Sequence, residues 1–275
     1  MPFVELKTSP HADGVSPVSI HYRDVGSGPP LVFLHGGWGY GVYPIDRQID
    51  ALSSRVRFLI PNRSGHGRST PFAGPLPLDF HRRAAEETLL VLDALGIERA
   101  FFWGHSDGAV IAAMIGLRAP ERCQRLLLEA FHFYRNKPAS HQVFFQRFAD
   151  HPEEVGGKVQ TLLAADHGEE NWQHVVRRNC RVWLELAAAA VASNQDPSNQ
   201  DRPNQDLYNG HLGELRVPVT FMHGRGDPRT EPDELERACA ALPRAEMRYV
   251  ETGRHSPHSE EAASRECTEI LSSLM

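Results

Sequence analysis

The run GHSDG at residues 104–108 places the tightest constraint on how this chain can fold. It fits the pattern G-x-S-x-G and lies between a strand-like run that ends at Trp103 and a helix-like run that begins near Asp107. A turn this short between a strand and a helix strains its central residue, and the flanking glycines relieve clashes with the neighbouring elements. We therefore expect the Ser106 hydroxyl to project over the edge of a sheet.

Apolar runs typical of strands alternate with helix-like segments on both sides of this turn. Strands are predicted at 31–34, 56–60, 100–103, 126–128, 217–222 and 246–250, and helices at 84–95, 107–118, 231–242 and from about Ser259. Gly96 follows the first helix, where glycine can adopt the left-handed cap conformation. The order predicts an α/β fold with a mostly parallel, doubly wound sheet.

The segment from Phe131 to about Arg216 has a different texture, because strand-like runs are missing and aromatic, His, Arg and Gln residues are frequent. We predict an α/β core at 1–130 and 217–275 and an inserted helical cap at 131–216. Within that cap, residues 193–206 contain Asn-Gln-Asp three times, which predicts a mobile loop.

Charge and composition exclude several classes of partner. The net charge is −6 and no basic cluster offsets it, so nucleic acid is not expected to bind. No apolar run approaches the length of a membrane span, and residues 1–13 do not resemble a signal peptide, so we expect a cytoplasmic protein without membrane contact. The four separated cysteines are expected to be reduced thiols, and a homo-oligomer remains open.

Ser106 is the predicted nucleophile, and two backbone amides are predicted to form an oxyanion hole beside it. The helix that follows the serine directs its free amides toward the same point, which makes the amide of Asp107 one donor. The sequence HGGWG at 35–39 follows an early strand, where a second donor is needed and glycine permits close approach. We predict the amide of Gly37 for this role, with that of Trp38 as the alternative.

A serine nucleophile needs a base, and the base needs an acid that holds its tautomer. Asp227 and His255 each follow a predicted strand, in the chain order Ser, Asp, His. The nearby His258 lies past Pro257 and is expected to point elsewhere. Glu129 ends the strand after the nucleophile helix and could approach the base instead, so Asp227 is the preferred acid and Glu129 stays open.

The glycine-rich run NRSGHGRS at residues 62–69 lacks both the P-loop and the G-x-G-x-x-G spacing, so we interpret it as a structural loop beside the site. No H-E-x-x-H motif or ligand cluster on one element indicates a metal. No metal and no cofactor are therefore expected.

The motifs at 35–37, 63–69, 104–108 and 253–258 together resemble the α/β-hydrolase superfamily, in particular its small bacterial esterase-like members. Asp107 is similar to the aspartate of the valacyclovir-hydrolase-like branch, and the resemblance implies that it binds the amino group of an amino-acid ester. The alternative is that Asp107 only occupies a helix first turn that favours a carboxylate. Serine at position 106 disfavours the dehalogenase and epoxide hydrolase reactions of this superfamily, which use an aspartate nucleophile.

We therefore expect hydrolysis of a small carboxylic ester through an acyl-enzyme, with a small-molecule ester as the binding partner. A carbon–carbon bond hydrolase or peptidase with the same triad, and a slow-turnover ligand receptor, are the alternatives. The predicted substrate contacts are Asp107, Trp38, Glu129 and His132. Aromatic residues of the predicted cap are candidates for the pocket wall, although core packing is the simpler expectation for each: His132, Phe133, Tyr134, Trp172 and Trp183.

Overall fold

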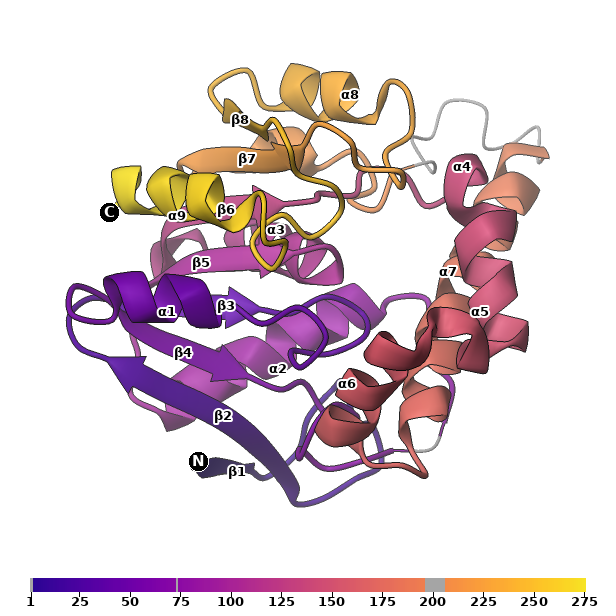
Figure 1. Cartoon of the computed structure of the whole chain (residues 1–275), viewed down its shortest axis with the longest axis horizontal. Helices are drawn as coiled ribbons and strands as arrows, with labels where there is room; N and C mark the ends of the chain where they lie inside the picture. The colour runs from indigo at the N-terminus through magenta and orange to yellow at the C-terminus, as the bar shows by residue number, and fades with distance from the viewer. Residues whose placement is uncertain (1, 73, 196–205) are drawn as a thin grey trace.

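One twisted sheet runs through the computed structural model, which describes residues 2–72, 74–195 and 206–275 (Figure 1). Within these residues its strand order is β1-β2-β4-β3-β5-β6-β7-β8. The strands are β1 Phe3–Leu6, β2 Val18–Gly26, β3 Pro30–Leu34, β4 Arg57–Pro61, β5 Ala100–His105, β6 Cys123–Glu129, β7 Val219–Gly224 and β8 Glu246–Val250.

The sheet is parallel from β4 to β8, and β1 and β2 extend it by antiparallel pairing. Leu34 of β3 pairs with Gly104 of β5, and His105 of β5 pairs with Glu129 of β6. Because parallel strands end at the same edge, the loops after β3, β5, β6 and β7 meet there. The predicted mostly parallel α/β sheet is confirmed.

Helices cover both faces of the sheet, because its strand side chains alternate between two apolar clusters. Helices α2 Phe80–Ala94 and α3 Asp107–Arg118 pack on one face, with α8 Glu234–Ala241. Helices α1 Asp46–Leu52 and α9 Ser264–Ser273 pack on the other. The chain is therefore doubly wound, as predicted.

Several element boundaries differ from the prediction. The sequence reading missed β1, β2 and α1, and it began α2 four residues late. It also placed the start of the last helix near Ser259, which is wrong: the helix begins at Ser264. The Glu260 carboxylate accepts hydrogen bonds from the amides of Arg254 and Ser256, which holds the preceding residues in turns instead of a helix. Gly96 adopts the predicted left-handed conformation, with φ of 67°.

The segment between β6 and β7 is helical and lies beside the end of the sheet where the parallel strands finish (Figure 1). We call residues 131–216 the cap segment. Its helices are α4 Pro138–Ser140, α5 Arg147–Asp150, α6 Gly157–His167 and α7 Trp172–Gln195. The predicted loop at 193–206 is helical as far as Gln195, and residues 196–205 lie outside the described residues. The division into core and cap stays a prediction.

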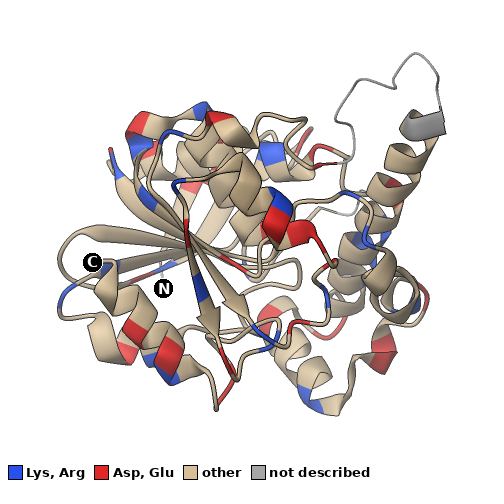
Figure 2. Ribbon diagram, turned by 90° about the horizontal axis from the view of Figure 1, so that it is seen from above, with Lys and Arg blue, Asp and Glu red and all other residues tan. Residues whose placement is uncertain are grey.

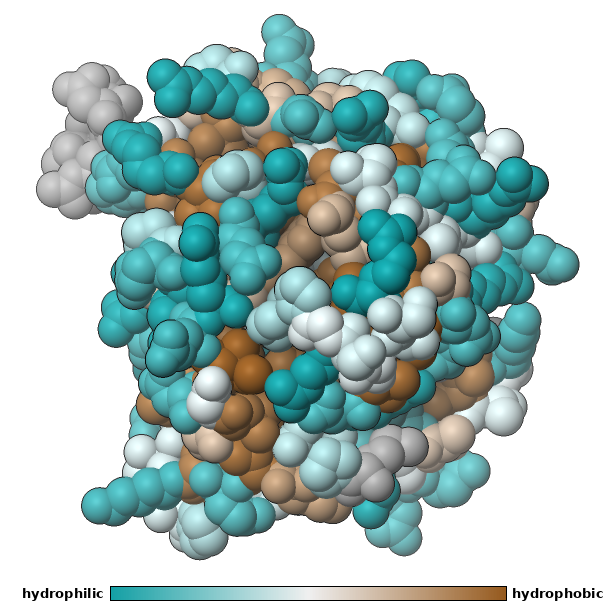
Figure 3. All heavy atoms as spheres, turned by 90° about the vertical axis from the view of Figure 1, so that its left-hand side faces the viewer, coloured by the Kyte–Doolittle hydropathy of each residue, from teal (hydrophilic) through white to brown (hydrophobic). Residues whose placement is uncertain are grey.

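Figure 2 shows that Lys and Arg residues alternate with Asp and Glu residues along the ribbon, so neither sign of charge is confined to one element. The face opposite the cap segment carries mainly hydrophilic side chains, with separate hydrophobic patches between them (Figure 3). None of the described helices combines the length and apolar character needed to cross a membrane.

Candidate active site

Ser106 lies in the turn between β5 and α3 with φ of 55° and ψ of −121°, a conformation that residues with a side chain rarely adopt. The two glycines of the motif are required by packing. A Cβ atom on Gly104 would lie 2.1 Å from the Gly108 carbonyl oxygen, and one on Gly108 would lie 1.9 Å from that of Leu34. Close approach of β5, α3 and β3 thus presents the serine at the edge of the sheet.

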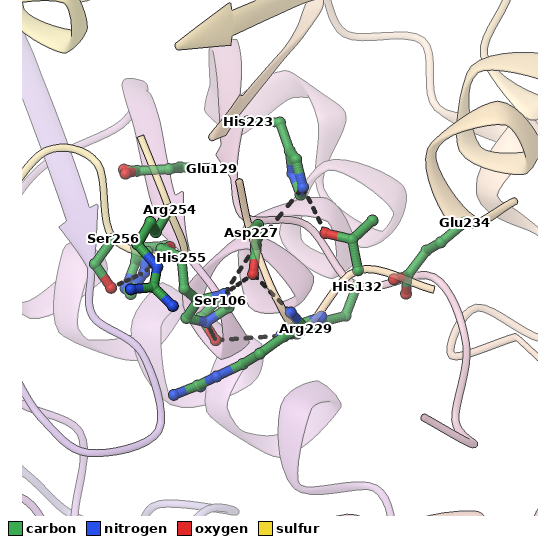
Figure 4. Close-up of polar contacts among 12 residues, drawn as sticks. Ser106, Glu129, His132, His223, Asp227, Arg229, Glu234, Arg254, His255 and Ser256 are labelled. Carbon is green, nitrogen blue, oxygen red and sulfur yellow. Dashed lines mark hydrogen bonds and ion pairs between the residues drawn. The ribbon is translucent and has the colours of Figure 1, made fainter. Parts of the chain in front are cut away.

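Three predicted residues form a continuous hydrogen-bonded chain (Figure 4). His255 Nε2 lies 3.1 Å from Ser106 Oγ, and His255 Nδ1 lies 2.9 Å and 3.1 Å from the two carboxylate oxygens of Asp227. Asp227 is carried by the loop after β7, and its carboxylate also accepts the amide of Arg229. The structure brings Ser106, His255 and Asp227 together in the order that a nucleophile, base and acid require.

Burial and nearby charges determine the protonation states of Asp227 and His255. Burial opposes ionisation of Asp227, but His255, His223 and the hydrogen bond from the Arg229 amide together outweigh it and lower the pKa of the carboxyl. Burial also lowers the pKa of His255, and the positive charge of Arg229 lowers it further, against the opposing effect of Asp227. His255 is therefore neutral, and its Nε2 atom can accept the Ser106 proton.

His132 is a second imidazole beside Ser106. It follows β6, and its Nε2 atom lies 3.2 Å from Ser106 Oγ. Since His255 Nε2 accepts the single hydroxyl proton, the hydrogen bond to His132 requires its Nε2–H to donate to Oγ. Burial lowers the pKa of His132, which favours this neutral form, and its Nδ1 is buried without a partner among the described residues. The sequence indicated a substrate contact here but not a bond to the serine.

Residues of the glycine-rich run at 62–69 form hydrogen bonds with the loop after β3. The buried Arg63 guanidinium donates to the carbonyl oxygens of His35 and Gly36, at 2.6 Å and 2.8 Å. His66 Nε2 lies 3.0 Å from the carbonyl oxygen of Gly37. These contacts agree with a structural role for residues 62–69, and they fix the loop that carries Gly37 and Trp38 beside Ser106.

Asp107 is the first residue of α3, so its amide has no carbonyl one turn earlier in the helix to bond. Its buried carboxylate is fully engaged. One oxygen accepts His81 Nε2 at 3.1 Å and Trp183 Nε1 at 3.0 Å, and the other accepts Asn179 Nδ2 at 2.7 Å. Burial raises the pKa of this carboxyl, but His81, Arg63 and Asn179 together outweigh it and the net shift is downward. Asp107 thus joins the nucleophile turn to α7 of the cap segment.

Glu129, the alternative acid, bonds a different histidine. Its carboxylate accepts His258 Nδ1 at 2.7 Å and Trp103 Nε1 at 2.9 Å, and all three side chains are buried. His258 Nε2 donates to the Tyr43 carbonyl oxygen, so both ring nitrogens are donors. Burial opposes the charged imidazolium, but Glu129, the Tyr43 carbonyl and Glu260 together outweigh it and raise the pKa of His258. His258 and Glu129 form a buried ion pair of their own.

The pocket above Ser106 is narrow, with about 20 Å³ open to the centres of water molecules. That is room for about one water molecule. Of the candidate wall residues, His132 and Trp183 line it, whereas Phe133, Tyr134 and Trp172 do not. Among residues 2–72, 74–195 and 206–275, no group of three or more His, Cys, Asp or Glu side chains is arranged to hold a metal ion.

Four of the described residues that line the pocket were not predicted from the sequence: Tyr43, Phe145, Asn179 and Arg229. Asn179 is one polar residue in a long helix, and nothing in the sequence distinguishes it. Arg229 did carry a signal, since it lies two positions after Asp227 in a loop that follows a strand.

Comparison with known proteins gives consistent matches. The model of the alpha/beta hydrolase fold family matches residues 29–262. A pimeloyl-[acyl-carrier protein] methyl ester esterase of Nitrosomonas europaea is 28% identical over 262 residues, which cover 87% of this chain and 93% of that protein. A putative carbamate hydrolase of Azorhizobium caulinodans is 34% identical over 119 residues, which cover 43% of each chain.

The chain spans only about two fifths of the length of the first curated relatives it matches, 43%, 41% and 38%. Among solved structures, a hydrolase from Pseudomonas aeruginosa superposes with a TM-score of 0.69 and 23% identity, covering 99% of this chain and 98% of that one. This similarity shows that the two proteins share a fold.

Proposed function

Because the chain belongs to the α/β-hydrolase fold family, we propose that it is a serine hydrolase that cleaves a small carboxylic ester through an acyl-enzyme intermediate. One observation carries the proposal: the unbroken chain of hydrogen bonds from Asp227 through His255 to a serine at positive φ. A serine held in this strained conformation at the edge of a sheet has no evident structural use.

In the proposed acylation, Ser106 Oγ attacks the ester carbonyl carbon while His255 Nε2 takes the hydroxyl proton. Asp227 keeps the other proton of the ring on Nδ1 and stabilises the imidazolium that forms. The amides of Gly37 and Asp107, or of Trp38 in place of Gly37, donate to the carbonyl oxygen as it becomes negative. The tetrahedral intermediate then expels the alcohol, to which His255 returns the proton.

Deacylation repeats these steps with water as the nucleophile. His255 takes a proton from the water, the hydroxide adds to the acyl carbon, and the serine oxygen leaves with the proton that His255 returns. The products are a carboxylic acid and an alcohol, and the enzyme regains its starting protonation.

His132 supports the proposal as a substrate contact. Its Nε2–H donates to Ser106 Oγ in the free enzyme. When Oγ bonds to the acyl carbon, its electron density is withdrawn, and the same N–H can donate to the nearest substrate oxygen. We propose that the cap segment supplies this part of the pocket wall through Trp183 and Asn179, which limits the substrate to small groups.

The relatives support a hydrolase that acts on an acyl group, since their names describe a methyl ester esterase and a carbamate hydrolase. An ester is favoured over an amide because an alcohol leaves without the strong leaving-group activation that an amine requires. Matched substrates with ester and amide bonds, such as 4-nitrophenyl acetate and 4-nitroacetanilide, separate these activities.

The proposal is tested with Ser106→Ala, and Ser273→Ala, an exposed serine on α9, serves as the matched control. We expect Ser106→Ala to abolish hydrolysis of 4-nitrophenyl acetate above the background rate and to prevent covalent labelling by a fluorophosphonate. Ser273→Ala should keep both properties. An active preparation in which Ser106→Ala hydrolyses the ester at the native rate would show that the nucleophile is assigned wrongly.

A further inference from the structure

Arg229 is a half-buried cation beside the nucleophile (Figure 4). Its guanidinium carbon lies 3.5 Å from the centroid of the Phe144 ring and 6.0 Å from that of Trp38. Stacking of this kind uses the flat face of the guanidinium. The N–H groups at its edge remain free to donate in plane.

No carboxylate of the described residues forms an ion pair with this guanidinium, and its contacts there are with aromatic rings. Arg225, four residues earlier in the same loop, differs because its charge is paired. It is exposed, stacks on Tyr249 and forms an ion pair with Glu251. A free planar fork of N–H donors is the group that proteins use to bind carboxylates at two points. Arg229 therefore offers binding capacity that the fold itself does not use.

The space next to Arg229 has the size of a ligand site. A hollow of about 370 Å³ adjoins the serine pocket and shares Tyr43, Arg229 and His255 with it. Ligand pockets commonly hold about 300–1,000 Å³. We call it the outer hollow. Besides these residues it is lined by Ser140, Phe144, Arg254 and Glu260, among others.

The charge in the outer hollow is positive where it opens toward the serine. Arg254 is a second arginine on its wall. Glu260 is the one acidic residue among the described residues that line the hollow. Its carboxylate accepts hydrogen bonds from the amides of Arg254 and Ser256, at 2.8 Å and 3.1 Å. A negative group in the hollow would thus meet two guanidinium groups and a carboxylate that is already bonded.

The positive charge of Arg229 repels protonated His255, and a bound anion would reduce this repulsion. In the proposed mechanism His255 becomes an imidazolium, and the nearby positive charge of Arg229 disfavours that state. A carboxylate bound at Arg229 would offset this repulsion in the transition state. Asp107, by contrast, offers little to a cationic substrate, because both of its oxygens already accept hydrogen bonds from protein side chains.

We infer that Arg229 and the outer hollow form a carboxylate-binding subsite, so that the substrate is a monoester that carries a free carboxylate besides its scissile bond. The inference rests on the proposed ester hydrolase and names its substrate class. The ester carbonyl lies at Ser106, and the carboxylate accepts the N–H edge of Arg229.

The test compares a charged ester with a neutral one of the same skeleton. The rate constants kcat/KM are measured for monoethyl and diethyl esters of succinate, glutarate and adipate, and the ratio of monoester to diester is taken for each length. We expect the native protein to prefer the monoester for at least one length. In Arg229→Gln this ratio should fall about tenfold or more, the size expected for a charge-assisted hydrogen bond.

Two further variants separate charge from structure. Arg229→Lys keeps the charge without the planar fork and should retain part of the preference. Arg225→Gln removes a charge from the same loop outside the hollow and should leave the ratio at its native value. Because each ratio comes from one preparation, a loss of folded protein cancels.

Binding gives a readout that needs no turnover. Isothermal titration of Ser106→Ala with monoethyl adipate, glutarate and succinate should show binding that weakens about tenfold in Ser106→Ala/Arg229→Gln. An equal monoester-to-diester ratio in native protein and Arg229→Gln at every length, or equal affinity in the two serine variants, would overturn the subsite while leaving the hydrolase intact. Native-rate hydrolysis by Ser106→Ala would instead overturn the proposed function.

Discussion

The Nε2 atom of His132 lies 3.2 Å from the Oγ of Ser106, so the serine hydroxyl contacts an N–H donor as well as the imidazole of His255. The two rings at the serine, His132 and His255, are stacked with 5.7 Å between their centroids. A hydroxyl that donates to one imidazole and accepts from the other is fixed in one orientation. This arrangement has consequences for rate that can be measured.

Replacement of His132 by Phe keeps a flat ring against Trp183 but removes the donor. We expect kcat/KM for 4-nitrophenyl acetate to fall about 10- to 100-fold, the effect of one lost hydrogen bond near the reacting atoms. His132→Gln, which can still present an N–H group, should recover part of the loss. Native activity in His132→Phe would exclude a contribution from this contact.

The roles of Asp227 and Glu129 can be distinguished by replacing each carboxylate with the neutral amide of equal size. Asp227→Asn should lower kcat about 10⁴-fold, because the amide favours the wrong tautomer of His255. Glu129→Gln should keep kcat near the native value but lower the free energy of unfolding by about 3–5 kcal/mol, since it strands a buried charged His258. Steady-state kinetics and urea unfolding measure the two effects. A larger fall of kcat in Glu129→Gln than in Asp227→Asn would reverse the assignment of the acid.

The pH dependence of kcat/KM reports the base in the free enzyme. His255 acts when neutral, and its pKa is lowered by burial and by Arg229, so the acid limb should have its midpoint below 6.5. Arg229→Gln removes a charge that lowers this pKa, so the midpoint should move to higher pH. The neutral diethyl adipate is the suitable substrate, with Arg225→Gln as the control that should not move. A midpoint that shifts downward in Arg229→Gln would contradict the assignment.

Gly108 is predicted to tolerate no side chain. Its Cβ position lies 1.9 Å from a backbone oxygen of β3, which cannot rotate away as a side chain could. Gly108→Ala should therefore lower the free energy of unfolding by more than about 3 kcal/mol or prevent accumulation of folded protein. Gly157→Ala, at the start of α6 with open space around its Cβ position, should keep native stability in thermal unfolding. Equal melting temperatures for the two variants would show that β3 and α3 can separate at little cost.

The parts of the fold that sequence could predict are those with a short-range signal. Buried strands such as β3 and β4 contain continuous apolar runs, and the turn at Ser106 needs glycines that few other structures require. The strand β2, which lies between β1 and β4, was missed because its polar residues interrupt the apolar pattern. Its partner β4 supplies the hydrogen bonds, and that pairing depends on residues distant in sequence.

The same reasoning applies to the site. Strand ends indicated Ser106, Asp227 and His255 because each follows a recognisable strand. Asn179 and His81 reach Asp107 from two different helices, and only the packing of α7 and α2 brings them there. Long-range packing of this kind leaves no local pattern in a sequence.

The carboxylate of Asp107 accepts hydrogen bonds from α2, which packs on the sheet, and from α7 of the cap segment. As a result, the nucleophile turn and the cap segment are not exchangeable modules in this chain. A chimera that received the cap of another family member would leave Asp107 buried with only His81 as a partner. Engineering a new specificity by cap replacement would therefore have to redesign position 107 together with the incoming helix.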